Sequence, residues 1–214
     1  TYATFGDASS LDPYWNYETF GDGILEDVYD TLVTYQGADA SKVIPKLATW
    51  EVSDDGTIYT FHLRESKWSD GSPLTAHDFV YSWKRAIDPA TASEYGWLWH
   101  YTNVVGAEEA NNGEADLEDV GIRAVDDYTF EVKLKAPADY FASLSSFYHF
   151  QPVKQSSVEH PDGAEGAWAQ NPDIFVSNGP FVLTSYTIGG GLTLEKNPYY
   201  WAADEVGIDV INVA

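Results

Sequence analysis

Hydrophobic and polar residues alternate most regularly over residues 57–63 of this chain. Tyr59, Phe61 and Leu63 occupy every second position and have polar residues between them. A period of two places these three side chains on one face of an extended segment, which predicts a half-buried strand. Asp54-Asp55-Gly56 precedes the segment and is typical of a turn.

Several other segments also have the pattern of strands, and two pairs of them flank short turns. Asp126-Asp127-Tyr128 separates one pair and Gly189-Gly190-Gly191 the other, so each pair predicts a hairpin. In addition to 57–63, the expected strands are 1–5, 120–125, 129–134, 181–188, 192–196 and 208–213.

Two segments have helical spacing instead. The first predicts a helix over 23–32 that Asp22 or Gly21 would cap. The residues of its apolar stripe are Ile24, Leu25, Val28 and Leu32.

A second helix is expected to begin at Thr75, because Thr75-Ala76-His77-Asp78 resembles a capping box with Asp in place of Glu. Asp88-Pro89 would end it, since the residue before a proline avoids the helical conformation. The apolar face of this helix consists of Phe79, Val80, Trp83 and Ile87.

The remaining segments are shorter or more polar. We expect a short helix within 138–147, an exposed helix end and loop over 107–118, and a loop-rich stretch over 155–173. Strands and helices alternate without the βαβ rhythm of a parallel sheet, so the pattern predicts an α+β fold. One core is expected to contain Tyr59, Phe61, Leu63, Phe79, Trp83, Phe130 and Val132.

The charge balance of the chain limits the classes of partner that it can bind. The 214 residues include 34 Asp and Glu but only 11 Lys and Arg, which gives a formal net charge of -23. Nucleic-acid binding is therefore excluded as a partner class, because it requires a basic surface. Adaptation to high salt is the favoured interpretation. An acidic environment outside the cell and a surface that avoids association remain alternatives.

Candidate catalytic and metal chemistry is sparse. The chain has no Cys, so disulfides, thiol catalysis and Cys-based metal sites are excluded. Its five His residues show no metalloprotease spacing, and no nucleophile elbow or phosphate-binding loop is present. We expect no enzymatic activity, no metal and no cofactor. The five His residues are His62, His77, His100, His149 and His160.

Residues 48–71 and the helix start that follows form the most informative combination. Trp68-Ser69-Asp70-Gly71 follows the alternating strand, and Leu74-Thr75-Ala76-His77-Asp78-Phe79 comes next. This combination closely resembles the signature of the family 5 extracellular solute-binding proteins, which bind peptides, nickel complexes and other solutes for ABC importers. Further segments match the family in the same order: 10–13 (SLDP), 88–95 (DPATASEY), 127–132 (DYTFEV), 177–181 (SNGPF) and 195–201 (EKNPYYW).

The resemblance implies a periplasmic-binding-protein-like fold of type II, cluster C. In it, segments 1–33 and 154–214 would form a first, mixed-sheet lobe, and 34–153 a smaller inserted α+β domain. Usual members close a second lobe over the ligand. We expect that lobe to be absent from this chain, together with the return of the first.

The resemblance also implies ligand-contacting residues. Tyr17, Glu18 and Thr19 would pair their backbone with an extended ligand, Tyr95 would line the site, and Asn178-Gly179 would lie near it. From the residues alone, Tyr95 could instead serve in packing, and Asn178-Gly179 could form a turn that needs a positive φ. Trp97, Trp99 and Tyr101 suggest a strand with one aromatic face, which could stack on a ligand or pack internally.

The function expected from the resemblance is capture of peptides or similar small solutes, outside the cytoplasm, for an ABC importer. The protein would be periplasmic or anchored at the cell surface, and its partners would be the solute and the membrane subunits of the importer. The alternative is a structural or assembly protein that reuses this fold and self-associates through an exposed cleft face.

Overall fold

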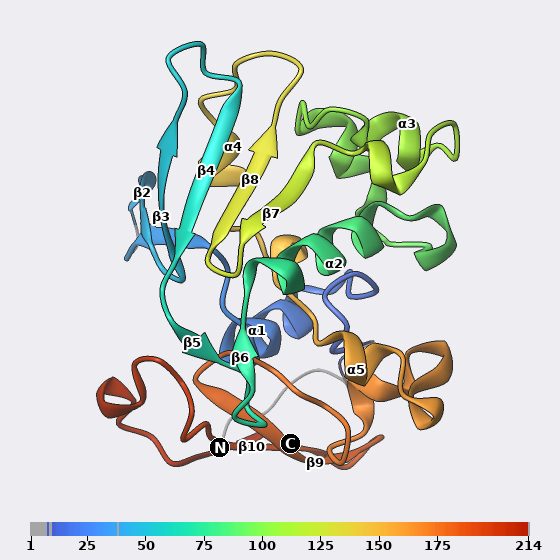
Figure 1. Cartoon of the computed structure of the whole chain (residues 1–214). Coiled ribbons are helices and arrows are strands. Elements are labelled where there is room, and N and C mark those ends of the chain that lie inside the picture. The colour runs from blue at the N-terminus through green and yellow to red at the C-terminus, as the bar shows by residue number, and fades with distance from the viewer. Residues whose placement is uncertain (1–7, 9, 38, 214) are drawn as a thin grey trace. The chain divides into compact units, whose positions relative to one another are not determined.

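The computed structural model describes residues 8, 10–37 and 39–213 (Figure 1). The strand expected over 1–5 lies outside the described residues. The chain divides into two compact units. Unit 1 comprises Thr1–Asp30, Glu65–Leu74 and Val153–Ala214, and unit 2 comprises Thr31–Arg64 and Thr75–Pro152. The expected domain boundaries stay a prediction; the compact units differ from them chiefly in residues 65–74, which belong to unit 1.

Unit 2 is built on a four-stranded sheet in the order β3-β4-β8-β7, in which all neighbours are antiparallel (Figure 1). The expected hairpin and the expected alternating strand are both confirmed. Tyr59, Phe61 and Leu63 are buried and lie on one face of β4. The strands are β3 (Ala48–Val52), β4 (Ile58–Leu63), β7 (Ile122–Asp126) and β8 (Thr129–Lys133).

The amphipathic helix α2 (Ala76–Ile87) packs against β7 and β8 and completes the core of unit 2. Its capping box is present: the Thr75 N–H donates to Asp78 Oδ2 over 2.7 Å, and the Thr75 side chain accepts from the Asp78 N–H. Such a cap stabilises a helix by about 1 kcal/mol. The helix ends before Asp88-Pro89, as predicted.

Trp83 lies at the centre of this core. Its ring stands edge-on to Phe130 with the ring centroids 4.9 Å apart, and it also contacts Trp99 and Phe150. The Trp83 Nε1–H donates to the Phe150 carbonyl over 3.0 Å, so the one polar atom of the side chain is satisfied. Every residue of the expected core is buried, which confirms the prediction.

The rest of unit 2 consists of short elements. The hairpin of β1 (Val33–Gln36) and β2 (Asp39–Pro45) was not predicted. The expected helix within 138–147 is confirmed but confined to one turn. The other elements are η1 (Pro89–Thr91), η2 (Gly96–Tyr101), α3 (Ala107–Asn111), η3 (Leu117–Asp119), α4 (Phe141–Leu144) and η4 (Tyr148–Phe150).

Unit 1 contains the three-stranded antiparallel sheet β11-β10-β9, and α1 (Thr19–Val28) contacts β9. The second predicted hairpin and the last predicted strand are both present. The stretch 155–173 is more helical than expected. The remaining elements of unit 1 are β5 (Ser66–Lys67), β6 (Pro73–Leu74), α5 (Gln155–Val158), η5 (Pro161–Gln170), β9 (Phe181–Thr187), β10 (Gly191–Lys196), η6 (Ala203–Glu205) and β11 (Val210–Val213).

The boundaries predicted for the first helix are wrong by one turn. The helix begins at Thr19 rather than after Asp22, and Glu18 is its N-cap without a side-chain hydrogen bond. It ends at Val28, so Leu32 is buried but lies outside the helix. The α+β class is confirmed, and all strand pairs formed by the described residues are antiparallel.

Candidate functional site

The segment that precedes α1 is held in place by Asn16, whose side chain is buried. Asn16 Nδ2 donates to the Glu18 carbonyl over 3.2 Å and to Asp22 Oδ1 over 2.7 Å. These two bonds fix the entry to the helix from the inside. Glu18 consequently keeps an extended backbone, with φ -108° and ψ 134°.

Tyr17, Glu18 and Thr19 present free backbone donors beside an exposed ring. The N–H groups of these three residues form no hydrogen bond with any residue that the structure describes. A helix start leaves such N–H groups without intrahelical partners, and here no side chain caps them. The Tyr17 side chain is 59% exposed. This geometry suits pairing with an extended chain, which draws its affinity from main-chain hydrogen bonds.

Asn178 has a structural function that the sequence did not reveal. Its side chain is buried and bonds both backbone groups of Asp30: the Asp30 N–H donates to Oδ1 over 3.1 Å, and Nδ2 donates to the Asp30 carbonyl over 3.2 Å. The amide thus fastens the chain just beyond the last turn of α1. Contact of Asn178 with a ligand stays a prediction.

Gly179 is required for a close approach of two backbones. A Cβ atom at this position would lie 2.4 Å from the Val28 carbonyl carbon and 2.6 Å from the Tyr29 nitrogen. The Gly179 N–H donates to the Val28 carbonyl over 2.8 Å, which caps the helix end. The positive φ suggested for this turn is wrong, because neither Asn178 nor Gly179 has one.

Within unit 1 the predicted site residues form two groups at opposite ends of α1. Tyr17, Glu18 and Thr19 lie at its start, whereas Asn178 and Gly179 bond the residues at its end. Ten helical residues at 1.5 Å each separate the two groups by about 15 Å. A ligand contacted by both groups would have to extend along the helix.

Tyr95 belongs to unit 2, where its half-buried ring packs in an aromatic cluster. Its ring centroid lies 5.5 Å from that of Phe147 and 5.9 Å from that of Tyr148. Its hydroxyl forms no hydrogen bond with the described residues. The ring therefore has a packing function, while the hydroxyl stays available. Convergence of Tyr95 with the unit 1 residues stays a prediction.

The aromatic run that follows Tyr95 is a 3-10 helix, so the expected strand is wrong. Trp99 is buried against Trp83 and Phe150, whereas Trp97 is 54% and Tyr101 65% exposed. Three residues per turn place positions two apart on different sides, which alternation in the sequence does not reveal.

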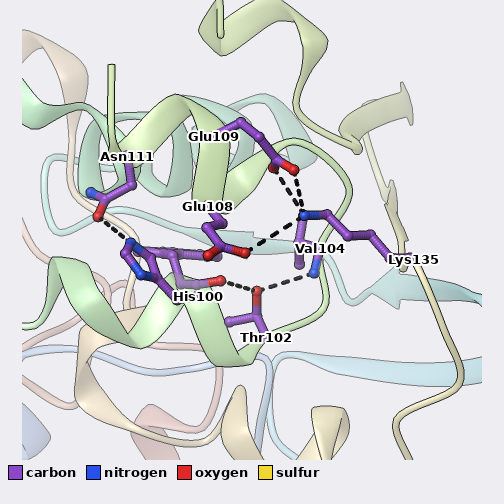
Figure 2. A network of polar contacts seen from close by, with 8 residues as sticks. His100, Thr102, Val104, Glu108, Glu109, Asn111 and Lys135 are labelled. Atoms are coloured by element: carbon purple, nitrogen blue, oxygen red, sulfur yellow. Dashed lines mark hydrogen bonds and ion pairs between the residues drawn. The ribbon is translucent and has the colours of Figure 1, made fainter. Parts of the chain in front are cut away.

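A polar network holds this region together (Figure 2). His100 Nε2 lies 3.0 Å from Asn111 Oδ1, which links η2 to α3. Thr102 Oγ1 accepts from the Val104 N–H over 3.1 Å. Lys135 Nζ lies 2.7 Å from Glu109 Oε1, which ties α3 to the segment after β8. These contacts hold the segment that carries the exposed rings of Trp97 and Tyr101 in place.

One carboxyl on α1 has an unusual proton affinity. Burial, together with the nearby charge of Glu26, raises the pKa of Asp27 to about 6. Asp27 is only half-buried.

Among the described residues no cluster of three or more His, Cys, Asp or Glu could hold a metal ion, and no helix is long and apolar enough to cross a membrane.

Comparison with known proteins gives one consistent result. Residues 42–214 match the model of the family described as bacterial extracellular solute-binding proteins, family 5 Middle. The oligopeptide-binding protein OppA of Bacillus subtilis (strain 168) is 42% identical over 165 residues, which cover 76% of this chain and 29% of that protein.

Solved structures extend the similarity to almost the whole chain. The substrate-binding domain of the oligopeptide ABC transporter from Bacillus anthracis str. Ames matches with a TM-score of 0.90 and 35% identity. Haemophilus influenzae OppA in complex with RPPGFSPFR matches with a TM-score of 0.90 and 33% identity. Each match covers 99% of this chain but only 40% of the other.

Proposed function

Because this chain belongs to the family 5 bacterial extracellular solute-binding proteins, we propose that it is part of a receptor that captures peptides or similar small solutes outside the cytoplasm. The receptor would deliver them to the membrane subunits of an ABC importer. The chain spans 29% of the curated relative's length and 40% of the matched structures, so the proposal concerns a part of such a receptor.

The observation that carries this proposal is the set of N–H groups at Tyr17, Glu18 and Thr19, which have no hydrogen-bond partner among the described residues. An extended peptide could pair with these donors, while the exposed Tyr17 ring would cover one of its side chains. Such recognition reads the peptide backbone and needs no chemical step. The similarity to a relative solved with a bound nonapeptide supports the same ligand class.

Thr19 offers a direct test, because proline is tolerated at the first position of a helix and lacks the N–H group. The extended conformation of Glu18 also suits the residue before a proline. Thr19→Pro therefore removes one donor and should leave the fold intact. Thr19→Ala is the matched control, since it removes the side chain and keeps the N–H group.

The measurement is a titration of the amide NMR signals with a mixed pool of tri- to pentapeptides. We expect weak binding that shifts the signals of residues 17–19, because a ligand normally needs most of its surface enclosed. The peptide concentration at the titration midpoint should rise about fivefold in Thr19→Pro and stay unchanged in Thr19→Ala. Equal midpoints in the two variants, or no shift at these residues, would contradict the proposal.

The alternative, an assembly protein, is favoured by one specific observation. Trp97, Tyr101 and Tyr140 expose more than half of their surface in unit 2, and such patches mark protein contacts. Self-association would bury them. Sedimentation at increasing protein concentration tests this alternative, with Trp97→Ala expected to weaken any dimer. A monomer at all concentrations would reject it.

A further inference from the structure

An aromatic patch lies on the surface of unit 2 and consists of Trp97, Tyr101 and Tyr140. Each of the three residues is more than half exposed, although aromatic side chains contribute most to stability when they are buried. The ring centroids of Trp97 and Tyr101 lie 6.0 Å apart, and the Tyr140 hydroxyl donates to the Tyr101 carbonyl over 2.8 Å. The three side chains therefore form one group rather than separate exposed residues.

The residues around the aromatic patch hold it in place. Trp99 belongs to the same 3-10 helix η2 as two of the rings, and it is buried against Trp83, which anchors the helix to the core. Asn103 Nδ2 lies 3.3 Å from the Tyr140 hydroxyl and donates to it. Side chains that are positioned in advance lose little conformational freedom when they bind a partner. The patch is therefore preorganised for a contact with another molecule.

The chain that carries η2 is strongly acidic. Residues 86–122 contain eight acidic residues and no Lys or Arg. The acidic residues are Asp88, Glu94, Glu108, Glu109, Glu114, Asp116, Glu118 and Asp119. Such a run produces a negative potential, which attracts cations and repels anions.

Glu94 places part of this charge beside the rings. The Gly96 N–H donates to the Ser93 carbonyl, so the chain already coils with about three residues per turn as it enters η2. Residues three apart lie above one another in such a coil, which places Glu94 on the same side as Trp97. The Glu94 carboxylate is exposed and forms no ion pair or hydrogen bond with the described residues. Its charge is therefore available to a partner.

The acidic side chains of α3 differ from Glu94, because they already have a cation. Lys135 Nζ lies 3.9 Å from Glu108 Oε2 and 2.7 Å from Glu109 Oε1 (Figure 2). Asp139 comes directly before Tyr140, is exposed and forms no ion pair with the described residues. Carboxylates without such a cation thus remain next to the aromatic patch.

We propose that the aromatic patch docks a basic segment of a partner protein. An Arg or Lys side chain of that segment would lie over the ring of Trp97 or Tyr101, because the face of an aromatic ring attracts a cation. Glu94 and Asp139 would pair with further cations of the same segment. This surface belongs to unit 2 and does not use the backbone donors of residues 17–19, which belong to unit 1.

Other occupants suit the aromatic patch less well. A second copy of this chain would bring two surfaces of the same sign together, because each copy has a net charge of -23. A small solute normally needs most of its surface enclosed, whereas these rings are open. An extended basic segment can lie across an open surface and contact several side chains at once.

The test is an amide NMR titration with a triarginine peptide whose ends are acetylated and amidated. Tricitrulline, blocked in the same way, is the matched probe, because citrulline has the shape of arginine without its charge. The buffer contains ~0.15 M salt, which limits electrostatic effects to about 8 Å. We expect saturable shifts at Trp97, Tyr101 and Tyr140 with triarginine, and about tenfold weaker binding of tricitrulline.

Three variants separate the aromatic patch from net charge and from folding. Trp97→Leu keeps an apolar side chain but removes the aromatic face, so it should weaken triarginine binding about fivefold. Glu94→Gln should weaken it about threefold, because it removes one charge beside the rings. Asp204→Asn is the matched control and should leave the affinity unchanged, since it changes the net charge equally but lies in unit 1. All three positions are exposed, so the variants should fold.

Three outcomes would overturn the proposal. These are equal binding of the two peptides, unchanged binding in Trp97→Leu, and an equal loss in Glu94→Gln and Asp204→Asn. Shifts at residues 17–19 in place of the aromatic patch would overturn it as well, while they would support the peptide site of unit 1. Dimerisation of the free protein that Trp97→Leu abolishes would assign the patch to a second copy instead.

Discussion

The Asn178 side chain hydrogen-bonds both the N–H and the C=O group of Asp30, a residue 148 positions earlier in the chain. Both residues are buried, so neither backbone group could turn to water if the amide were lost. The Asn178 side chain thus satisfies both backbone groups just after α1 ends, and it fixes the path of the chain as it leaves the helix.

Asn178→Ala is therefore expected to lower the free energy of unfolding by about 3 kcal/mol, because it leaves two buried backbone groups without partners. Urea denaturation measures the change. Asn212→Ala is the control: Asn212 is exposed, and among the described residues its side chain bonds only Thr193 Oγ1, so we expect a change within about 0.5 kcal/mol. Similar losses in the two variants would contradict the function given to Asn178.

Gly179→Ala should destabilise by about 3 kcal/mol or more, since its Cβ would lie 2.4 Å from a backbone carbon and force two segments apart. Gly23→Ala should have the opposite effect and raise the free energy of unfolding. Gly23 lies within α1 with nothing within 4 Å of an added Cβ, and alanine favours a helix by about 1 kcal/mol over glycine. Thermal and urea unfolding of both variants test this contrast, and a common sign would refute it.

Trp83→Ala is expected to cost roughly 3–5 kcal/mol, because it empties the centre of the unit 2 core. Trp97→Ala removes the same side chain from an exposed position and should change stability by no more than about 0.5 kcal/mol. Denaturant midpoints distinguish the two. A small loss at Trp83 would mean that the core closes without it.

Asp27 predicts a pH dependence with a definite sign. Burial raises its pKa to about 6 in the folded chain from 3.8, so folding favours the protonated carboxyl. The free-energy cost of ionising this carboxyl in the folded chain is therefore absent below pH ~4, and it lowers the stability as the pH rises through 6. Asp27→Asn should raise the melting temperature at pH 7 to 8 and have no such effect below pH ~4. A benefit that does not depend on pH would exclude ionisation as its cause.

Salt should stabilise the chain if its acidity is an adaptation to high salt. The net charge of -23 repels itself, and ~1 M salt shortens electrostatic interactions to about 3 Å. We expect the melting temperature to rise steadily between dilute buffer and ~1 M KCl. A flat or falling melting temperature would reject the high-salt interpretation.

The sequence alone determined the elements whose information is local. The alternation of Tyr59, Phe61 and Leu63 specified β4, and the capping box at Thr75 with the proline at 89 specified both ends of α2. In each case the decisive residues lie within a few positions of one another. The order of several short motifs along the chain also indicated the family.

The tertiary structure alone decided the features that depend on distant residues. The end of α1 is set by Asn178 and Gly179, and the run from Trp97 to Tyr101 coils with Trp99 buried against Trp83. Likewise, Arg123 and Glu131 pair only through the strand register. Local pattern fixes periodicity and caps, whereas such contacts arise from the packing of segments that the sequence keeps far apart.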